Sequence, residues 1–280
     1  MHLLRRSLQS AHSSLRSNVH VFYDITLTTL IFLICAAFCA GLIDSMAGGG
    51  GLIQLPALLI GLTKFETVEV LGTNKLTSVF GTSAATLLYR RAITFNWKLL
   101  VAMALPAFIG SIGGALLASS IPTKALRPII VILLIAVVIY TVMRPQLGAV
   151  ESLKHSPKKQ MRIGSIAAGS IGFYDGLIGP GTGSFLILIL VAVLGFAFLQ
   201  ASAMAKVINL CTNVGAILVF GLDGSILWKV GLLLAVANVA GGLIGATLAI
   251  RGGSTFVRKV FLFITTALIF KVGLDTITMW

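Results

Sequence analysis

Charged side chains are scarce in this sequence, and acidic ones are the scarcest. Of the 280 residues, 10% are charged, with 21 Lys and Arg against 8 Asp and Glu. A soluble globular domain is about 25% charged, so this composition excludes an ordinary soluble protein. It also leaves no polar basic domain that could bind nucleic acid. The formal net charge of +13 instead fits basic loops that face the cytosol and anionic lipids at a membrane.

Residue types that commonly carry chemistry are also few. The three cysteines lie in apolar runs, where cysteine usually serves as a small hydrophobic side chain. All four histidines lie in polar flanks, so no apolar segment contains the base that commonly activates a serine nucleophile. The phosphate-loop pattern G-x-x-x-x-G-K-[ST] is missing as well. We therefore expect no catalytic residue, no metal and no cofactor, and neither an enzyme nor a nucleotide-driven pump.

What the sequence contains in abundance is apolar runs. Hydrophobic residues make up 57% of the chain, and the mean hydropathy is +1.03. A spanning helix needs about 20 apolar residues, so the chain has room for roughly nine or ten membrane segments. We expect an all-α, polytopic membrane protein. Its predicted segments are about 25–43, 52–62, 67–89, 97–118, 125–143, 163–178, 184–199, 201–221, 226–250 and 256–274.

The two halves of the chain match at a constant offset of 131 residues. Asp44 corresponds to Asp175 and Lys75 to Lys206 at this offset, as Trp97 does to Trp228. Chance similarity between apolar helices would match Leu and Ala rather than these rarer residues. The sequence therefore predicts two homologous repeats. The predicted parts are a basic N-terminal tail at 1–24, membrane repeat 1 at 25–143, a basic polar linker at 144–161 and membrane repeat 2 at 162–280.

Duplicated halves are typical of secondary transporters, which bind their substrate between the repeats near the bilayer midplane. Segment 52–62 has 11 residues, about 17 Å of helix, which is too short to span, and 163–175 is short too. A re-entrant hairpin followed by three spans in each half would make the repeats inverted. One helix broken at glycines plus three spans would make them parallel. We favour inversion, and the parallel arrangement is the alternative.

Nearly all charged residues fall at the ends of the apolar segments, but four do not fit there easily, and they form two repeat-related pairs, Asp44 with Asp175 and Lys75 with Lys206. A charge at the bilayer centre costs about 2.5–3.5 kcal/mol on insertion scales, so such residues pair or face an aqueous cavity. Two structural Asp–Lys salt bridges would satisfy them. We favour a polar functional site at the interface between the repeats.

A run of glycines follows each of these aspartates. Four follow Asp44, and the run after Asp175 has Pro180 between Gly179 and Gly181. Each glycine costs a helix about 1 kcal/mol relative to alanine, and proline removes a backbone donor, so both helices should break here. A broken helix exposes N–H groups and a positive dipole end, and both favour an anion. Close helix packing is the alternative explanation.

Polar residues also recur at helical spacing. Lys75, Ser78 and Thr82 lie at i, i+3 and i+7, on one helix face. Their repeat counterparts are Lys206, Asn209 and Asn213. Two such faces would line a cavity if they met, or form a hydrogen-bonded helix seam. The G-x-x-x-G pairs at 110–114 and 241–245 predict closely packed helices.

Paired motifs carry a family resemblance. GLIDSMAGGGGLIQLPALL with GTNKLTS in the first half, and IGFYDGLIGPGTGSF with AKVINLCTNVGA in the second, resemble the sulfite exporter TauE/SafE family of membrane transporters, particularly its YfcA-like branch. The resemblance covers about 25–275. It implies a carrier of sulfite, sulfonates or related organic anions in a bacterial inner membrane. Because Ala205 stands where the first half has Asn74, the two sub-sites are not identical.

We therefore expect a secondary transporter that moves a small anion by alternating access, with an anion channel built on a glycine backbone filter as the alternative. Its aspartates would hold the lysines in the empty site or take a coupling proton. The expected partners are the anion, the lipid bilayer and that proton, without nucleic acid, and a homodimer is compatible. The candidate substrate-binding residues are Asp44, Gly48, Gly49, Gly50, Gly51, Asn74, Lys75, Ser78, Asp175, Gly179, Gly181, Lys206, Asn209 and Asn213.

Overall fold

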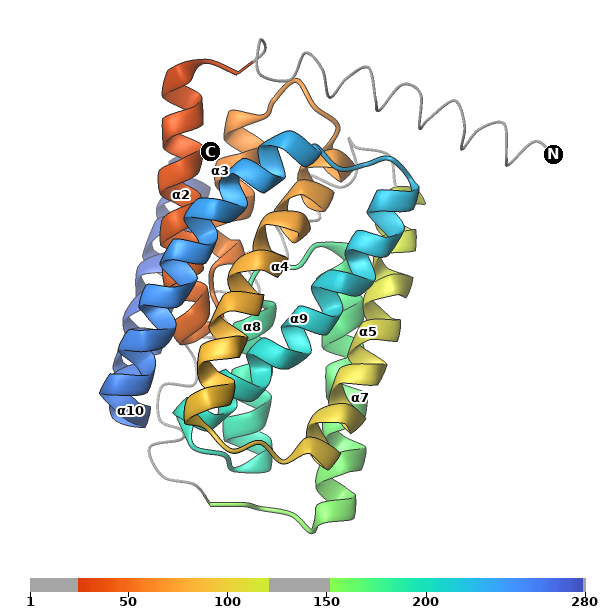
Figure 1. The fold of residues 1–280 in the computed structure, drawn as a ribbon, viewed down its shortest axis with the longest axis vertical. Helices are drawn as coiled ribbons and strands as arrows, with labels where there is room; N and C mark the ends of the chain where they lie inside the picture. Colours follow the sequence, from red (N-terminus) through yellow and green to blue (C-terminus); the bar gives the residue numbers. More distant parts are fainter. Residues whose placement is uncertain (1–24, 121–151, 279–280) are drawn as a thin grey trace, which may run out of the picture.

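The computed structural model describes residues 25–120 and 152–278, and in these ranges every regular element is a helix (Figure 1). The all-α prediction is confirmed for this part of the chain, while the predicted segment 125–143 lies outside it. The elements are α2 (Leu27–Ala47), α3 (Gly51–Gly61), α4 (Thr67–Ala92), α5 (Trp97–Ser120), α7 (Pro157–Leu177), α8 (Thr182–Leu188), the π-helical turn η2 (Ile189–Leu194), α9 (Phe198–Leu222) and α10 (Trp228–Thr278).

Four of these helices are long and apolar enough to cross a bilayer: α2, α5, α9 and the part of α10 from Trp228 to Val260. Helices α4 and α7 have 26 and 21 residues and match them in length, but carry more charge. Gly253 (φ 66°, ψ −171°) bends α10, between the two segments predicted there. The chain is thus a multi-pass integral membrane protein.

The helices follow one another in the same order in both halves. Helices α3, α4 and α5 begin at residues 51, 67 and 97, and their counterparts α8, α9 and α10 begin 131 residues later, at 182, 198 and 228. Helix α7 begins at Pro157, inside the predicted linker 144–161, because proline is favoured in the first turn of a helix. The segment 163–175, predicted to be short, therefore belongs to a helix of 21 residues, and that part of the prediction was wrong.

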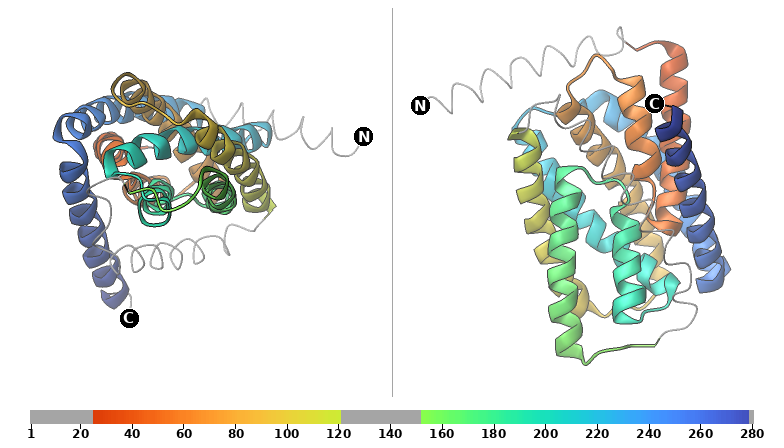
Figure 2. Two further views of the ribbon diagram at one scale, coloured as in Figure 1. Left: turned by 90° about the horizontal axis from the view of Figure 1, so that it is seen from below. Right: turned by 180° about the vertical axis from the view of Figure 1, so that it is seen from behind.

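The chain breaks at both glycine runs, and each short helix folds back along its predecessor. A β-carbon added at Gly61, at the end of α3, would lie against Leu33 near the start of α2, whereas one at Gly50 would meet Ala40. In the second half, Gly164 near the start of α7 lies close to Leu194 at the end of η2. Helices α2 and α3 form one hairpin, and α7 and α8 form the other. Helix α2 runs down from the top of Figure 1, and α7 runs up from the bottom, as Figure 2 also shows.

The two halves interlock rather than lie side by side. Helix α2 of the first half packs against α10 of the second, and α7 packs in turn against α5, while α4 and α9 contact each other. The expected close packing at the G-x-x-x-G pairs is confirmed. A β-carbon at Gly241 would collide with the Phe38 carbonyl, and one at Gly110 with the repeat-related carbonyl of Gly169.

Two apolar clusters of side chains lie toward opposite ends of the helices, with the buried polar residues between them. One joins the end of α4, the starts of α5, α7 and α9, and the bend of α10, and includes Leu99, Phe198 and Val257. The other joins the start of α2, the end of α3 and the α9–α10 connection, and includes Leu33, Leu62 and Ile226. The buried charges are thereby held in a layer midway along the bundle.

Candidate functional site

The four buried charges form two ion pairs, and each pair joins one half of the chain to the other. Lys75 on α4 binds Asp175 on α7, with Nζ 2.8 Å from Oδ1. Lys206 on α9 binds Asp44 on α2, with Nζ 2.7 Å from Oδ2. Because the pairs are related by the repeat offset, the same arrangement occurs twice. The two Asp–Lys salt bridges weighed in the sequence do form.

Because the two ion pairs are buried, losing either partner would cost much free energy. The side chains of Lys75 and Asp175 are both 2% exposed, and that of Lys206 is 0% exposed. An unpaired charge at this depth would cost several kcal/mol, so the lysines are held here only with an anionic partner.

The two glycine runs meet at the centre, and their backbones approach so closely that no side chain would fit between them. Gly48 ends α2 in the left-handed conformation (φ 76°), and Gly179 and Gly181 take it between α7 and α8 (φ 93° and 81°). A β-carbon at Gly48 would collide with the backbone of Gly183, and Ser184 N donates a hydrogen bond to the Gly48 carbonyl at 3.1 Å. The two helix breaks therefore touch, and they place backbone groups of both halves at one site.

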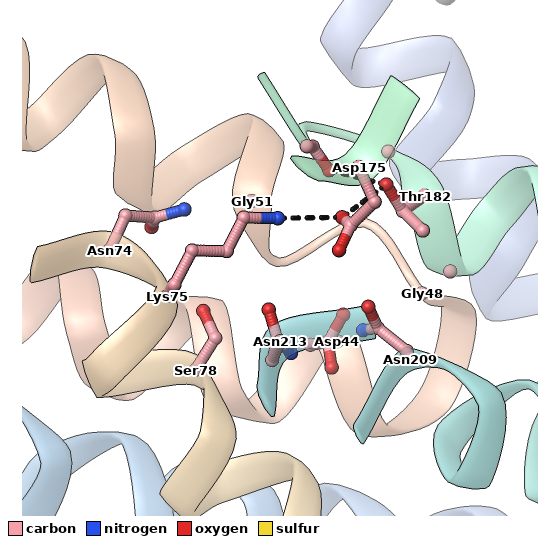
Figure 3. A pocket seen from close by; sticks show the side chains of 13 residues that line it. Asp44, Gly48, Gly51, Asn74, Lys75, Ser78, Asp175, Thr182, Asn209 and Asn213 are labelled. Carbon is pink, nitrogen blue, oxygen red and sulfur yellow. Dashed lines mark hydrogen bonds and ion pairs between the residues drawn. The ribbon is translucent and has the colours of Figure 1, made fainter. Parts of the chain in front are cut away.

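A small polar cavity lies between these breaks and the polar faces of α4 and α9 (Figure 3). Its volume is about 20 Å³, room for about one water molecule. In Figure 3, Asp175 and Thr182 lie on one side, opposite Ser78, Asn209 and Asn213. The lining residues are Asp44, Gly48, Gly51, Asn74, Lys75, Ser78, Asp175, Gly179, Gly181, Thr182, Gly183, Asn209 and Asn213.

The structure brings together eleven of the fourteen predicted site residues at this cavity. Lys206 reaches the site only through its bond to Asp44, and Gly49 and Gly50 do not line this cavity. Thr182 was not among the predicted residues, and its Oγ1 lies 2.6 Å from Asp175 Oδ1 and 2.7 Å from the Gly179 carbonyl. Its position inside the second glycine run, opposite Gly51 at the repeat offset, could have indicated it.

A second, smaller polar cavity adjoins the first and shares Asp44, Gly51 and Ser78 with it. Its volume is about 10 Å³. Gly50 lines this cavity rather than the first, together with Ala40 and two amides that the sequence analysis missed, Gln54 and Asn238. Both amides interrupt predicted apolar segments, which is a visible signal, but neither has a polar counterpart in the other repeat.

Several buried polar atoms at the first cavity have no hydrogen-bond partner. They are Asn74 Oδ1, Asp175 Oδ2 and Asn213 Nδ2. Leaving such an atom unpaired costs about 1–3 kcal/mol, and buried polar atoms in native proteins normally have a protein or water partner. The cavity therefore has spare donors and acceptors for a polar ligand or water. Among the described residues no group of His, Cys, Asp and Glu could hold a metal ion.

Known proteins resemble the chain along almost its whole length. The profile of the family described as Sulfite exporter TauE/SafE matches residues 33–272. A "Probable membrane transporter protein" from a Sinorhizobium species is 41% identical over 252 residues, covering 90% of this chain and 95% of that protein. One from Haemophilus influenzae is 34% identical over 90% of this chain and 97% of its own length.

The "Probable membrane transporter protein YfcA" of Escherichia coli is also 34% identical, over 87% of this chain and 89% of that protein. No solved structure matches the chain. The matched region includes both glycine-run helix breaks and both Asp–Lys pairs. The chain therefore belongs to the sulfite exporter TauE/SafE family and is a membrane transporter.

Proposed function

We propose that this protein is a secondary transporter that carries a small sulfur-containing or organic anion, such as sulfite or a sulfonate, by alternating access between its two halves. The observation that carries the proposal is the pair of buried lysines beside one cavity, each neutralised by a carboxylate from the opposite half. The lysines would supply charge to the anion, and the glycine breaks would supply backbone N–H donors. The fourteen predicted residues form the proposed binding site.

Charge balance supports a coupling proton. The two lysines and two aspartates make the empty site neutral, and a monovalent anion entering it would leave one uncompensated negative charge. A buried charge without a partner costs several kcal/mol, so uptake is favoured if one carboxylate becomes protonated as the anion binds. The proton moves from a hydronium ion to the carboxylate, which leaves a water molecule, and the anion replaces that carboxylate as the partner of the lysine.

The size of the cavity supports alternating access. A space of about 20 Å³ holds about one water molecule, whereas a sulfite ion is a sulfur atom surrounded by several oxygens. The anion can enter only if the ion pairs separate and the cavity widens. Because each pair joins one half of the chain to the other, opening the pairs removes two of the contacts that hold the halves together at the site.

We further propose that the repeats are inverted in the membrane. The opposite directions of α2 and α7 in Figures 1 and 2 support this. Charge supports the orientation of the bundle, because the segments joined by the apolar cluster around Leu99 and Phe198 carry only basic charge in the described sequence, which is typical of the cytosolic side. These residues are Arg90, Arg91, Lys98, Lys154, Lys158, Lys159, Arg162, Arg251, Arg258 and Lys259.

Counterflow in liposomes tests the proposal against the channel alternative. Purified protein is reconstituted with unlabelled sulfite inside, and entry of labelled sulfite is followed. A carrier shows saturable entry that internal sulfite accelerates, because the loaded site returns faster than an empty one. A channel shows no such acceleration and passes ionic current instead. Lys98→Ala at the start of α5, which does not line the cavity, serves as the matched lysine control and should transport normally.

A further inference from the structure

The two ion pairs are equivalent by the repeat but not in their surroundings. The Asp175 side chain is 2% exposed, and its Oδ1 receives both the Lys75 ammonium and the Thr182 hydroxyl. The Asp44 side chain is 18% exposed, and its described hydrogen bond comes from Lys206. The carboxylate of Asp44 is thus the more open of the two.

The second cavity lies against Asp44 and contains a donor whose orientation the structure fixes. Asn238 Nδ2 donates to the Ala37 carbonyl at 3.0 Å, which identifies it as the amide nitrogen, and it also donates to Gln54 Oε1 at 2.9 Å. The other end of the Gln54 amide must then be Nε2. This nitrogen is buried without a partner, on a side chain that is 2% exposed and lines the cavity with Asp44 and Ser78.

A water molecule fits this cavity. It would accept a hydrogen bond from Gln54 Nε2, have the Ser78 hydroxyl as a further partner and donate to the Asp44 carboxylate, and a buried water typically makes two to four such bonds. The volume of about 10 Å³ corresponds to about one water-sized probe. At the repeat-related positions stand Phe185 and Ala107 in place of Gln54 and Asn238, so Asp175 lacks the amides that would hold a comparable water.

We propose that the second cavity is a hydration site that delivers the coupling proton to Asp44, so that Asp44 rather than Asp175 is the proton acceptor. This rests on the transport function proposed above. The proton passes from a hydronium ion in the cavity to a carboxylate oxygen of Asp44, leaving water and a neutral carboxyl group. Lys206 keeps its charge, loses its anionic partner and binds the incoming anion. Gln54 and Asn238 act as positioning residues because they hold the water.

The other ionisable groups around Asp44 fit this role. Lys206 faces it from α9, and Lys75 and Asp175 face it across the first cavity from α4 and α7. Tyr89 of α4 donates its hydroxyl to the carbonyl of the next residue, Ser45, at 2.8 Å, and its repeat counterpart is Phe220. Helices α3 and α10 present the uncharged amides. Asp44 is therefore the one carboxylate at the junction of both cavities among the described residues.

The test compares two readouts in the same proteoliposomes: sulfite counterflow without a pH gradient, and sulfite accumulation driven by an imposed pH gradient. The variants are Gln54→Met and Asn238→Leu, which remove the fixed donor or its anchor. Phe185→Met, at the repeat position of Gln54, is the matched control. In both amide variants, we expect the ratio of gradient-driven accumulation to counterflow to fall to the ratio that wild-type protein shows when no pH gradient is imposed. In the Phe185→Met control, the ratio should equal that of wild-type protein under the gradient.

A wild-type ratio in Gln54→Met and Asn238→Leu would overturn the assignment, as would an equal loss in Phe185→Met. If the wild-type protein shows counterflow but no accumulation in response to the pH gradient, the assignment of Asp44 as proton acceptor is also overturned, and the carrier proposal stands. If wild-type protein shows no counterflow, the proposed transport function itself fails. The two proposals are therefore tested separately by one preparation.

Discussion

Removing Lys75 while leaving Asp175 in place should destabilise the protein strongly. The two side chains lie 2.8 Å apart and are each 2% exposed, so in Lys75→Met the carboxylate keeps the Thr182 hydroxyl but loses its cationic partner. Breaking a buried pair in this way costs about 3–5 kcal/mol. For a chain of this size, that lowers Tm by on the order of 10 °C.

The double variant Lys75→Met/Asp175→Asn separates this cost from the loss of a side chain. Both residues are then neutral and close in size to the originals, and replacing a buried pair by uncharged residues is often neutral in stability. Thermal unfolding in detergent micelles should show most of the lost Tm restored. An unchanged Tm in Lys75→Met, or a double variant no more stable than the single, would refute the assignment of a buried ion pair that needs both partners.

Three further predictions follow from the same geometry. Lys206→Met should lower Tm less than Lys75→Met in the same assay, because Asp44 is 18% exposed and water can solvate it; a larger drop would contradict the asymmetry. Gly241→Ala places a β-carbon against the Phe38 carbonyl, whereas Gly113→Ala has its nearest neighbour at 3.6 Å, so thermal unfolding should show a loss of about 1–3 kcal/mol only in the first. In a variant without Cys35, Cys39 and Cys211, an impermeant thiol reagent outside whole cells should label Asp223→Cys and spare Lys158→Cys, and the reverse pattern would exclude the proposed orientation.

The repeat offset predicted much of the fold, because rare residues at equal spacing must occupy equivalent places in two similar units. It placed the breaks at both glycine runs and the lysines on matching helices. It did not predict that each lysine would bind the aspartate of the other half. An offset relates Asp44 to Asp175, but which carboxylate meets which lysine depends on how the halves interlock, which is set by tertiary packing.

Two features could not be predicted from the sequence: polar residues that have no polar counterpart in the other repeat, and a helix whose first turn is charged. Gln54 and Asn238 have Phe185 and Ala107 as counterparts, so a search for matched polar residues passes over them. The start of α7 carries Lys158, which makes the first turn of a long helix look like a linker. Side-chain charge near a membrane surface is compatible with helix, so charge alone cannot set the boundary of the helix.

The most direct test of the central claim is labelled-sulfite counterflow by the Lys75→Met/Asp175→Asn protein, compared with wild type in the same liposomes. This variant is expected to stay folded, so lost transport would report the loss of the charged site rather than unfolding. We expect saturable entry that internal sulfite accelerates for wild type, and no entry above that of empty liposomes for the double variant. Wild-type counterflow by the well-folded double variant would contradict the claim that the buried Lys75–Asp175 pair is part of the anion-transport site.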